Sequence, residues 1–339
     1  MTTKLIKIGV FGAGHLGKIH LKLLNESREF NLIGFYDVNS EYSINIEKEF
    51  GYKYFDDPNY LIDSSDAVAI ITPTQFHHEI AMKCIEKCKH IFIEKPIAFT
   101  VDEAKEIVNF SKEKKIIGQV GHVERFNPAF NSVKKIIGKP MFIESHRLSE
   151  FNPRGTDVSV VLDLMIHDID IVLSLINSKV KKISSSGVSV ISETPDIANA
   201  RIEFDNGAVA NLTASRISLK NMRKLRFFQK ETYISVDLYN KKVEVVKMID
   251  APKKLDEFAL TLENAEGNKK QILFETPKII NYNAIQVELE NFANSINYNK
   301  QSIVSLEDGT EALKVAYSII NSMWFFMDLI EQKLENIKK

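Results

Sequence analysis

A glycine-rich turn between an apolar strand and an amphipathic helix constrains the fold of this chain more than any other feature. Residues 4–11 (KLIKIGVF) are typical of a buried strand, and Gly12 to Gly17 (GAGHLG) lead directly into a helix with an apolar side. In such a turn Gly12 makes a tight bend, Gly14 lets a pyrophosphate approach the backbone, and Gly17 lets helix and strand pack closely. The helix N-terminus adds free N–H groups and a favourable dipole for phosphate. The turn therefore predicts a nucleotide-binding fold.

The next strand supports this interpretation, because a lone glycine motif is weak evidence. Residues 31–36 are apolar and end in Asp37, twenty residues after Gly17. An acid at this place can accept hydrogen bonds from an adenosine ribose 2′-hydroxyl and repels a 2′-phosphate. The sequence therefore favours NAD over NADP as the cofactor.

Strands and helices alternate through the first third of the chain. Predicted strands at 67–71, 91–93 and 116–120 are separated by predicted helices at 41–50, 76–88 and 101–114. Helices of this length between strands imply βαβ units and a parallel sheet. We therefore predict an α/β fold in which residues 1–122 form a doubly wound parallel sheet, the NAD-binding Rossmann domain.

The pattern changes after residue 122. A helix at 129–137, a strand at 141–148 and the apolar helix 158–176 precede six predicted strands, at 183–190, 198–204, 208–215, 225–229, 233–237 and 243–248. Asp205-Asn206-Gly207 is a hairpin signal. Helices at 285–298 and 306–330 close the chain. We predict that residues 123–339 form an α+β domain for substrate binding and oligomerisation, with a large, mostly antiparallel open sheet.

Two groups of polar residues are candidates for chemistry. Lys95 follows the apolar strand 91–93 within the stretch 90–96 and precedes Pro96, and ligands bind at the carboxyl ends of strands in α/β sheets. On the apolar helix, Asp163, His167 and Asp170 follow a spacing that places them on about one face. Polar residues on a buried helix are costly unless they are paired or face a cleft. A surface lysine and a core histidine are the alternatives, and a metal site ranks low because no further ligand joins at suitable spacing.

Other charged residues give weaker signals. Arg125, Arg147 and Arg154 occupy loop or strand-end positions, where forked guanidinium groups suit phosphate and carboxylate, although surface arginines are also common. His77 and His78 begin the helix after Thr72-Pro73, where a histidine can approach the nicotinamide side of a cleft or simply face solvent.

Composition excludes several classes of function. Lys and Arg number 44 and Asp and Glu 45, giving a net charge of -1, which argues against partners such as nucleic acid or a membrane surface. The two cysteines, Cys84 and Cys88, are too few for a disulfide framework. No apolar run reaches the length of a membrane span, and no signal-peptide pattern is present, so a soluble cytoplasmic protein is expected.

The motifs together resemble one enzyme family. Gly12-x-Gly14-x-x-Gly17, Thr72-Pro73-x-x-x-His77, Glu94-Lys95-Pro96, Arg125-Phe126-x-Pro128 and Asp163-x-x-x-His167-x-x-Asp170 occur in the order of the Gfo/Idh/MocA oxidoreductases. The resemblance implies a homodimer or homotetramer assembled through the open sheet face. It implies Lys95 and His167 as catalytic residues, with Asp163 beside them. Implied cofactor contacts are Gly12, Gly14, His15, Leu16, Gly17, Asp37, Thr72, Pro73, His77, Glu94 and Lys95. Implied substrate contacts are Lys95, Arg125, Asn127, Arg147, Arg154, Asp163 and His167, with no metal.

A narrower resemblance concerns the substrate. Residues 121–128 (GHVERFNP) and 144–147 (ESHR), with the Asp163 to Asp168 stretch, are similar to the branch that oxidises the 3-hydroxyl of UDP-N-acetylglucosamine. A free sugar or polyol such as inositol is the alternative substrate, and a non-catalytic sugar-nucleotide sensor ranks below both. Two positions depart from the family pattern. Met165 replaces a usual glycine, which could narrow the sugar site, and Cys88 replaces a glycine at a predicted helix end.

Overall fold

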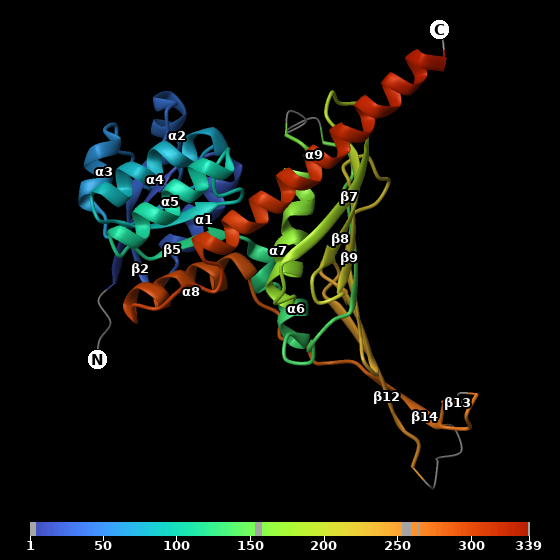
Figure 1. Ribbon diagram of the computed structural model, residues 1–339. Helices are drawn as coiled ribbons and strands as arrows, with labels where there is room; N and C mark the ends of the chain where they lie inside the picture. The colour runs from blue at the N-terminus through green and yellow to red at the C-terminus, as the bar shows by residue number, and fades with distance from the viewer. Residues whose placement is uncertain (1–4, 153–157, 253–258, 264, 338–339) are drawn as a thin grey trace. The chain divides into compact units, whose positions relative to one another are not determined.

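The structure is a computed structural model that describes residues 5–152, 158–252, 259–263 and 265–337 (Figure 1). It divides into two compact units. The first comprises Met1–Phe126 and Tyr282–Lys314, and the second comprises Asn127–Asn281 and Val315–Lys339. Among the described residues, no helix is both long enough and apolar enough to span a membrane.

The first unit is built on a parallel sheet of five strands, as predicted. Their order is β2 (Phe30–Tyr36), β1 (Ile6–Phe11), β3 (Ala67–Ile70), β4 (His90–Glu94) and β5 (Gly118–Gly121). All four residues of β3 are buried, as expected for a strand covered on both faces. Tyr54 forms a parallel bridge with Phe35 beyond β2, so this segment takes the place of a sixth strand. With it included, the strand order is that of a dinucleotide-binding Rossmann fold.

Helices connect these strands and begin where the sequence provides caps. They are α1 (His15–Asn25), α2 (Ser40–Phe50), α3 (Pro58–Ser64), α4 (His77–Glu86) and α5 (Val101–Glu113). Asn39 caps α2 by accepting from the Tyr42 N–H at 3.0 Å, and Thr100 with Glu103 forms a capping box on α5. The 3₁₀ helix η1 (Thr74–Phe76) leads into α4.

One closing helix belongs to the first unit, whereas the sequence analysis assigned everything after residue 122 to the second domain. Leu289 and Phe292 of α8 (Ala284–Asn297) lie in the same buried cluster as residues of α1, β1 and β4. The Phe292 ring centroid is 6.0 Å from that of Phe92 on β4. The amphipathic pattern predicts the helix correctly, but periodicity does not say which sheet an apolar face will cover.

The second unit contains a nine-stranded sheet that is mostly antiparallel, as predicted. Its order is β13 (Thr261–Glu263), β14 (Lys269–Glu275), β12 (Lys242–Asp250), β11 (Thr232–Asp237), β10 (Met222–Gln229), β6 (Phe142–Leu148), β9 (Val209–Ser215), β8 (Ile197–Phe204) and β7 (Val180–Val188). Among the described strands of this sheet, only β6 and β9 pair in parallel. The predicted hairpin joins β8 to β9, with Gly207 at a φ of +84°. Individual sequence predictions missed β13 and β14, whose side chains are exposed or only half-buried and carry little alternation.

Helices lie beside this sheet in Figure 1. They are the short α6 (Pro128–Val133) and the pair η3 (Val161–Met165) and α7 (Ile166–Leu175). The predicted continuous helix at 158–176 is in fact a π-helical segment, η3, followed by an α-helix. Apolar sequence carries no signal for the wider π turn, which is frequent at functional sites. The last helix, α9 (Leu306–Ile337), contributes residues to both units.

The helix end at Cys88 is closed by a left-handed residue. Cys88 has a φ of +55°, its N–H donates to the Ile85 carbonyl at 2.9 Å, and the Lys89 N–H donates to the Cys84 carbonyl at 2.9 Å. This is a Schellman motif, in which glycine is favoured because a Cβ is disfavoured at positive φ. The backbone conformation at this position therefore favours the glycine that the family pattern has in place of Cys88.

We predict that Cys88→Gly stabilises the protein by about 1 kcal/mol, because it removes the Cβ penalty at a positive φ. Thermal unfolding should shift upward by about 2 °C. The matched control is Gly51→Ala at the corresponding end of α2, where φ is +75° and a Cβ would meet no other atom within 4 Å. That control should lower the melting temperature, and an unchanged or lower value for Cys88→Gly would contradict the prediction.

Candidate active site

The glycine turn is a place where backbone segments approach too closely for side chains. Gly12 has a φ of +91°, and a Cβ there would lie 2.6 Å from the Ile71 carbonyl oxygen. A Cβ on Gly17 would clash with the Gly12 carbonyl oxygen. Gly14 differs, because a Cβ there would meet nothing within 4 Å. Gly12 and Gly17 are thus required for packing, and Gly14 leaves open space at the start of α1.

This open space has the features of an anion site. Gly14 caps α1 without a side-chain hydrogen bond, and the first turn of the helix carries no acidic residue. The free N–H groups of a helix N-terminus attract negatively charged groups such as phosphate. His15 and Leu16, which were predicted to contact the cofactor, are both exposed in this first turn.

Asp37 lies directly beside the turn. Its Oδ2 accepts a hydrogen bond from the Ala13 N–H at 2.8 Å, and its Oδ1 accepts from the Asn39 N–H at 3.1 Å. The side chain is half-buried, and carboxylate oxygens have lone pairs for further donors. Asp37 therefore holds the turn in place and keeps acceptor capacity for a ribose hydroxyl.

The neighbouring loop after β3 brings Thr72, Pro73 and His77 together. His77 is 1% exposed, and its Nε2 lies 2.8 Å from the Thr72 carbonyl oxygen while its Nδ1 lies 2.9 Å from the Pro96 carbonyl oxygen. Burial lowers the pKa of His77, and the hydrogen bonds to the two carbonyls act in the opposite direction. Thr72 Oγ1 is buried and has no hydrogen-bond partner among the described residues. His77 is thus an interior residue. The sequence alone allowed either a position near the nicotinamide side of the cleft or a position facing solvent.

Glu94 and Lys95 end strand β4 at the same edge of the sheet. Glu94 Oε1 lies 2.9 Å from His20 Nε2 on α1, and its Oε2 accepts from the Lys95 N–H at 3.2 Å. A Cβ on Gly121 of β5 would come within 2.8 Å of Glu94 Oε2. Lys95 is half-buried, at the carboxyl end where such sheets bind ligands. His20, fully buried on α1, was not singled out by the sequence, because an isolated histidine on a helix gives no distinctive signal.

The remaining catalytic candidates belong to the second unit. Asp163 lies in η3 and His167 lies in the first turn of α7, and both are half-buried. Asp170 is buried, and Met165, the departure from the family glycine, is 0% exposed. Met165 therefore occupies the interior. The structure places Lys95 in one unit and Asp163 and His167 in the other.

Arg147 has a carboxylate partner that the sequence did not reveal. Its Nη2 lies 2.8 Å from Asp168 Oδ1 and its Nε lies 3.1 Å from Asp168 Oδ2, and both side chains are buried. Asp168 directly follows His167, so this ion pair ties the start of α7 to β6. Only the tertiary fold brings the two residues together.

The other predicted substrate contacts have different surroundings. Arg125 is buried in the 3₁₀ helix η2 (Val123–Phe126) of the first unit. Asn127 caps α6 by accepting from the Ala129 N–H at 3.0 Å, and its Nδ2 donates to the Leu238 carbonyl at 3.2 Å. Arg154 lies outside the described residues.

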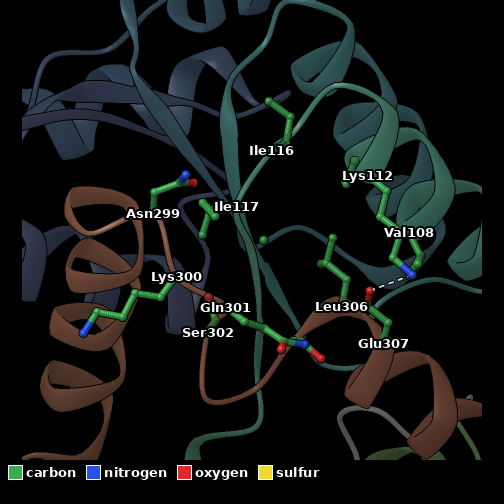
Figure 2. Close-up of a pocket in the computed structure, with 13 residues that line it drawn as sticks. Val108, Lys112, Ile116, Ile117, Asn299, Lys300, Gln301, Ser302, Leu306 and Glu307 are labelled. Carbon is green, nitrogen blue, oxygen red and sulfur yellow. Dashed lines mark ion pairs between the residues drawn. The ribbon is translucent and has the colours of Figure 1, made fainter.

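A separate hollow of about 370 Å³ lies between the end of α5 and the loop before α9 (Figure 2). Lys112 and Glu307 form an ion pair of 2.9 Å at one side of it, and Leu306 and Ile117 supply apolar surface. None of the predicted site residues lines this hollow. It is therefore distinct from the edge of the sheet where the glycine turn and Lys95 lie.

Comparisons with known proteins agree with the observed fold. Residues 6–122 match the model of the oxidoreductase family with an NAD-binding Rossmann fold, and residues 132–234 match the GFO/IDH/MocA C-terminal domain. UDP-N-acetylglucosamine 3-dehydrogenase of Acidithiobacillus ferrooxidans is 33% identical over 241 residues, which cover 71% of this chain and 76% of the relative. The chain belongs to the Gfo/Idh/MocA oxidoreductase family.

Two further comparisons, one with a solved structure and one with a relative, cover nearly all of this chain. A solved structure of the Acidithiobacillus ferrooxidans UDP-N-acetylglucosamine 3-dehydrogenase has a TM-score of 0.85 at 28% identity, covering 94% of this chain and 98% of that one. The NAD-dependent scyllo-inositol 2-dehydrogenase of Bacillus subtilis is 28% identical over 338 residues, covering 94% of both chains.

The residues of this oxidoreductase fit NAD. The open space at Gly14 accommodates a pyrophosphate, the Asp37 carboxylate can bind a ribose hydroxyl, and Thr72 Oγ1 is an orphaned polar atom beside the turn. These groups converge where the strand order reverses between β1 and β3, the position at which such folds bind dinucleotides.

Gly14→Ala should weaken NAD binding on the order of tenfold, a loss near 1.4 kcal/mol, because the methyl group enters the space for the pyrophosphate. Its melting temperature should stay unchanged, since the new Cβ meets no protein atom. Gly17→Ala is the contrasting variant and should destabilise the fold through its clash with the Gly12 carbonyl. Calorimetric titration with NAD and thermal unfolding separate the two effects. Unchanged NAD affinity in Gly14→Ala would place the pyrophosphate elsewhere.

Arg147→Met should cost about 3–5 kcal/mol of unfolding free energy, because it leaves the Asp168 carboxylate buried without its partner. The double variant Arg147→Met, Asp168→Leu should recover most of this loss, since no charge then stays buried. Urea denaturation of the two variants and the parent measures both effects. If the single variant unfolds like the parent and loses only substrate affinity, Arg147 acts as a ligand contact instead.

Proposed function

We propose that this protein oxidises the 3-hydroxyl of UDP-N-acetylglucosamine to the 3-keto sugar nucleotide, with NAD as the acceptor. The observation that carries the proposal is the 33% identity to a UDP-N-acetylglucosamine 3-dehydrogenase. The backbone similarity to the same enzyme, with a TM-score of 0.85 over 94% of this chain, supports it. More broadly, the relatives indicate an NAD-dependent dehydrogenase of a sugar or polyol hydroxyl.

A free polyol is the second candidate substrate. The scyllo-inositol 2-dehydrogenase of Bacillus subtilis aligns over a larger share of this chain, 94%, although at 28% identity. The two substrates share a secondary ring alcohol, and they differ in whether a nucleoside diphosphate accompanies it. The chemistry at the alcohol is therefore common to both candidates.

We assign the proton transfer to Lys95. When bound, NAD supplies the hydride acceptor. As the hydride leaves the alcohol carbon, the hydroxyl O–H bond breaks and its proton passes to the Lys95 Nζ, leaving a ketone and a protonated lysine. Glu94 holds the backbone of this lysine through the 3.2 Å bond from the Lys95 N–H.

The resemblance to the family also gives roles to residues of the second unit. His167 orients the sugar hydroxyl and shares its proton, and Asp163 positions the histidine. Arg125, Asn127, Arg147 and Arg154 are proposed for substrate binding, although Asn127 and Arg147 also have the structural partners described above. Assembly as a homodimer or homotetramer through the nine-stranded sheet stays a prediction from the sequence.

The deciding measurement is NADH absorbance when the purified protein and NAD are mixed with UDP-N-acetylglucosamine. We expect a 3-keto sugar nucleotide, identified by mass spectrometry, with 2-oxoglutarate added in one series in case tightly held NADH needs an acceptor. Lys95→Met should lower turnover by at least about 10²-fold while leaving NAD affinity nearly unchanged.

Three other outcomes are informative. NADH formed only with scyllo-inositol would retain the chemistry and reject the nucleotide substrate. No NADH with any substrate, despite NAD binding, would favour the sugar-nucleotide sensor. Loss of NAD binding in Lys95→Met would contradict the role given to the lysine.

A further inference from the structure

One buried imidazole connects two loops at the edge of the NAD-binding sheet. His77 is the first residue of α4 and is 1% exposed. Its Nε2 lies 2.8 Å from the carbonyl oxygen of Thr72, and its Nδ1 lies 2.9 Å from that of Pro96. Thr72 follows β3 and Pro96 follows β4, which are neighbouring parallel strands. The ring therefore bridges the loops that leave these two strands.

Both bridged loops carry residues of the proposed site. Pro96 directly follows Lys95, so the position of its carbonyl fixes the backbone on one side of the lysine. On the other side, the Lys95 N–H donates to Glu94 Oε2. Thr72 lies against the glycine turn, because a Cβ on Gly12 would be 3.1 Å from the Thr72 nitrogen. His77 thus connects the loop after β3, which lies beside the glycine turn, to the loop that carries Lys95.

Both nitrogens of the His77 ring face hydrogen-bond acceptors. Both partners are carbonyl oxygens, which only accept, and a neutral imidazole has a single N–H to donate. Burial lowers the pKa of His77, while the carbonyls of Thr72 and Pro96 and the carboxylate of Glu94 favour the charged ring. Burial is the largest of these effects, so the pKa of His77 lies below its ordinary value.

We infer that His77 is a positioning residue for hydride transfer, and that its Nδ1 contact with the Pro96 carbonyl sets the location of the Lys95 amine. The inference rests on the proposed function, in which Lys95 takes the proton of the alcohol. The Nε2 contact with Thr72 holds the adjacent cofactor loop. A misplacement of a catalytic group by about 1 Å can cost about 10²-fold in rate, so such a contact matters without touching any reactant.

Two amide substitutions separate the two contacts. In His77→Asn the side-chain amide nitrogen takes the place of Nδ1 and keeps the donor to Pro96. In His77→Gln the amide nitrogen takes the place of Nε2 and keeps the donor to Thr72. His77→Phe keeps the ring shape and has no donor to either carbonyl.

We expect kcat of His77→Gln and His77→Phe to fall by about ten- to a hundredfold, with His77→Asn within about threefold of the parent. The KM for NAD of His77→Gln should stay near that of the parent. A primary deuterium isotope effect on kcat, measured with substrate deuterated at the oxidised carbon, should increase in His77→Gln because hydride transfer becomes slower. Equal losses in the Asn and Gln variants, or losses that follow only their melting temperatures, would overturn the inference.

A second readout needs no substrate, so that failure of the inference and failure of the proposed function can be told apart. Reductive ¹³C-dimethylation labels the lysine amines, and Lys95→Met identifies the Lys95 signal in the NMR spectrum. This signal should shift in His77→Gln and stay in place in His77→Asn. The same displacement in both variants would overturn the inference, whereas a parent protein that forms no NADH with any sugar would reject only the proposed function.

Discussion

The close approach of backbone at the end of β1 is the constraint on which the rest of the first unit depends. The Ile71 carbonyl occupies the space that a Gly12 Cβ would need, and the Gly12 carbonyl occupies that of a Gly17 Cβ. Strand, turn, helix and the neighbouring β3 can meet only if both positions lack side chains. The open position at Gly14 then lies at a helix N-terminus, where a phosphate can reach the N–H groups. Steric exclusion at two glycines thus creates the binding space at the third.

Glu94 has a comparable role at the end of β4. Its carboxylate is oriented by His20 and accepts from the Lys95 N–H, and Gly121 leaves room for it on the adjacent strand. Glu94 therefore links α1, β4 and β5 through its contacts within the protein. Because a half-buried carboxylate is costly without partners, the contacts of Glu94 help to fix the backbone position of Lys95, which follows it.

The sequence was sufficient for the parts of the molecule that depend on local chemistry. Spaced glycines, capped helices and apolar strands predicted the parallel sheet, and Asp205-Asn206-Gly207 predicted a hairpin that the structure confirms. Three features required the tertiary fold: the packing of α8 on the first unit, the π-helical turn that carries Asp163, and the pairing of Arg147 with Asp168. Periodicity describes which side of a helix is apolar, and it does not identify the surface that side will cover.

Two side chains that are predicted to contact ligands also have partners inside the protein. Histidine and arginine near a predicted cleft suggested cofactor and substrate contacts, yet His77 binds two carbonyls and Arg147 binds a buried carboxylate. In both cases the buried group fixes backbone that carries another candidate, Lys95 beside Pro96 and His167 beside Asp168. A buried polar residue with internal partners can therefore place backbone, in addition to any contact that it makes with a ligand. Substitutions at such positions should alter chemistry through the backbone they hold, because the interior transmits small displacements instead of absorbing them.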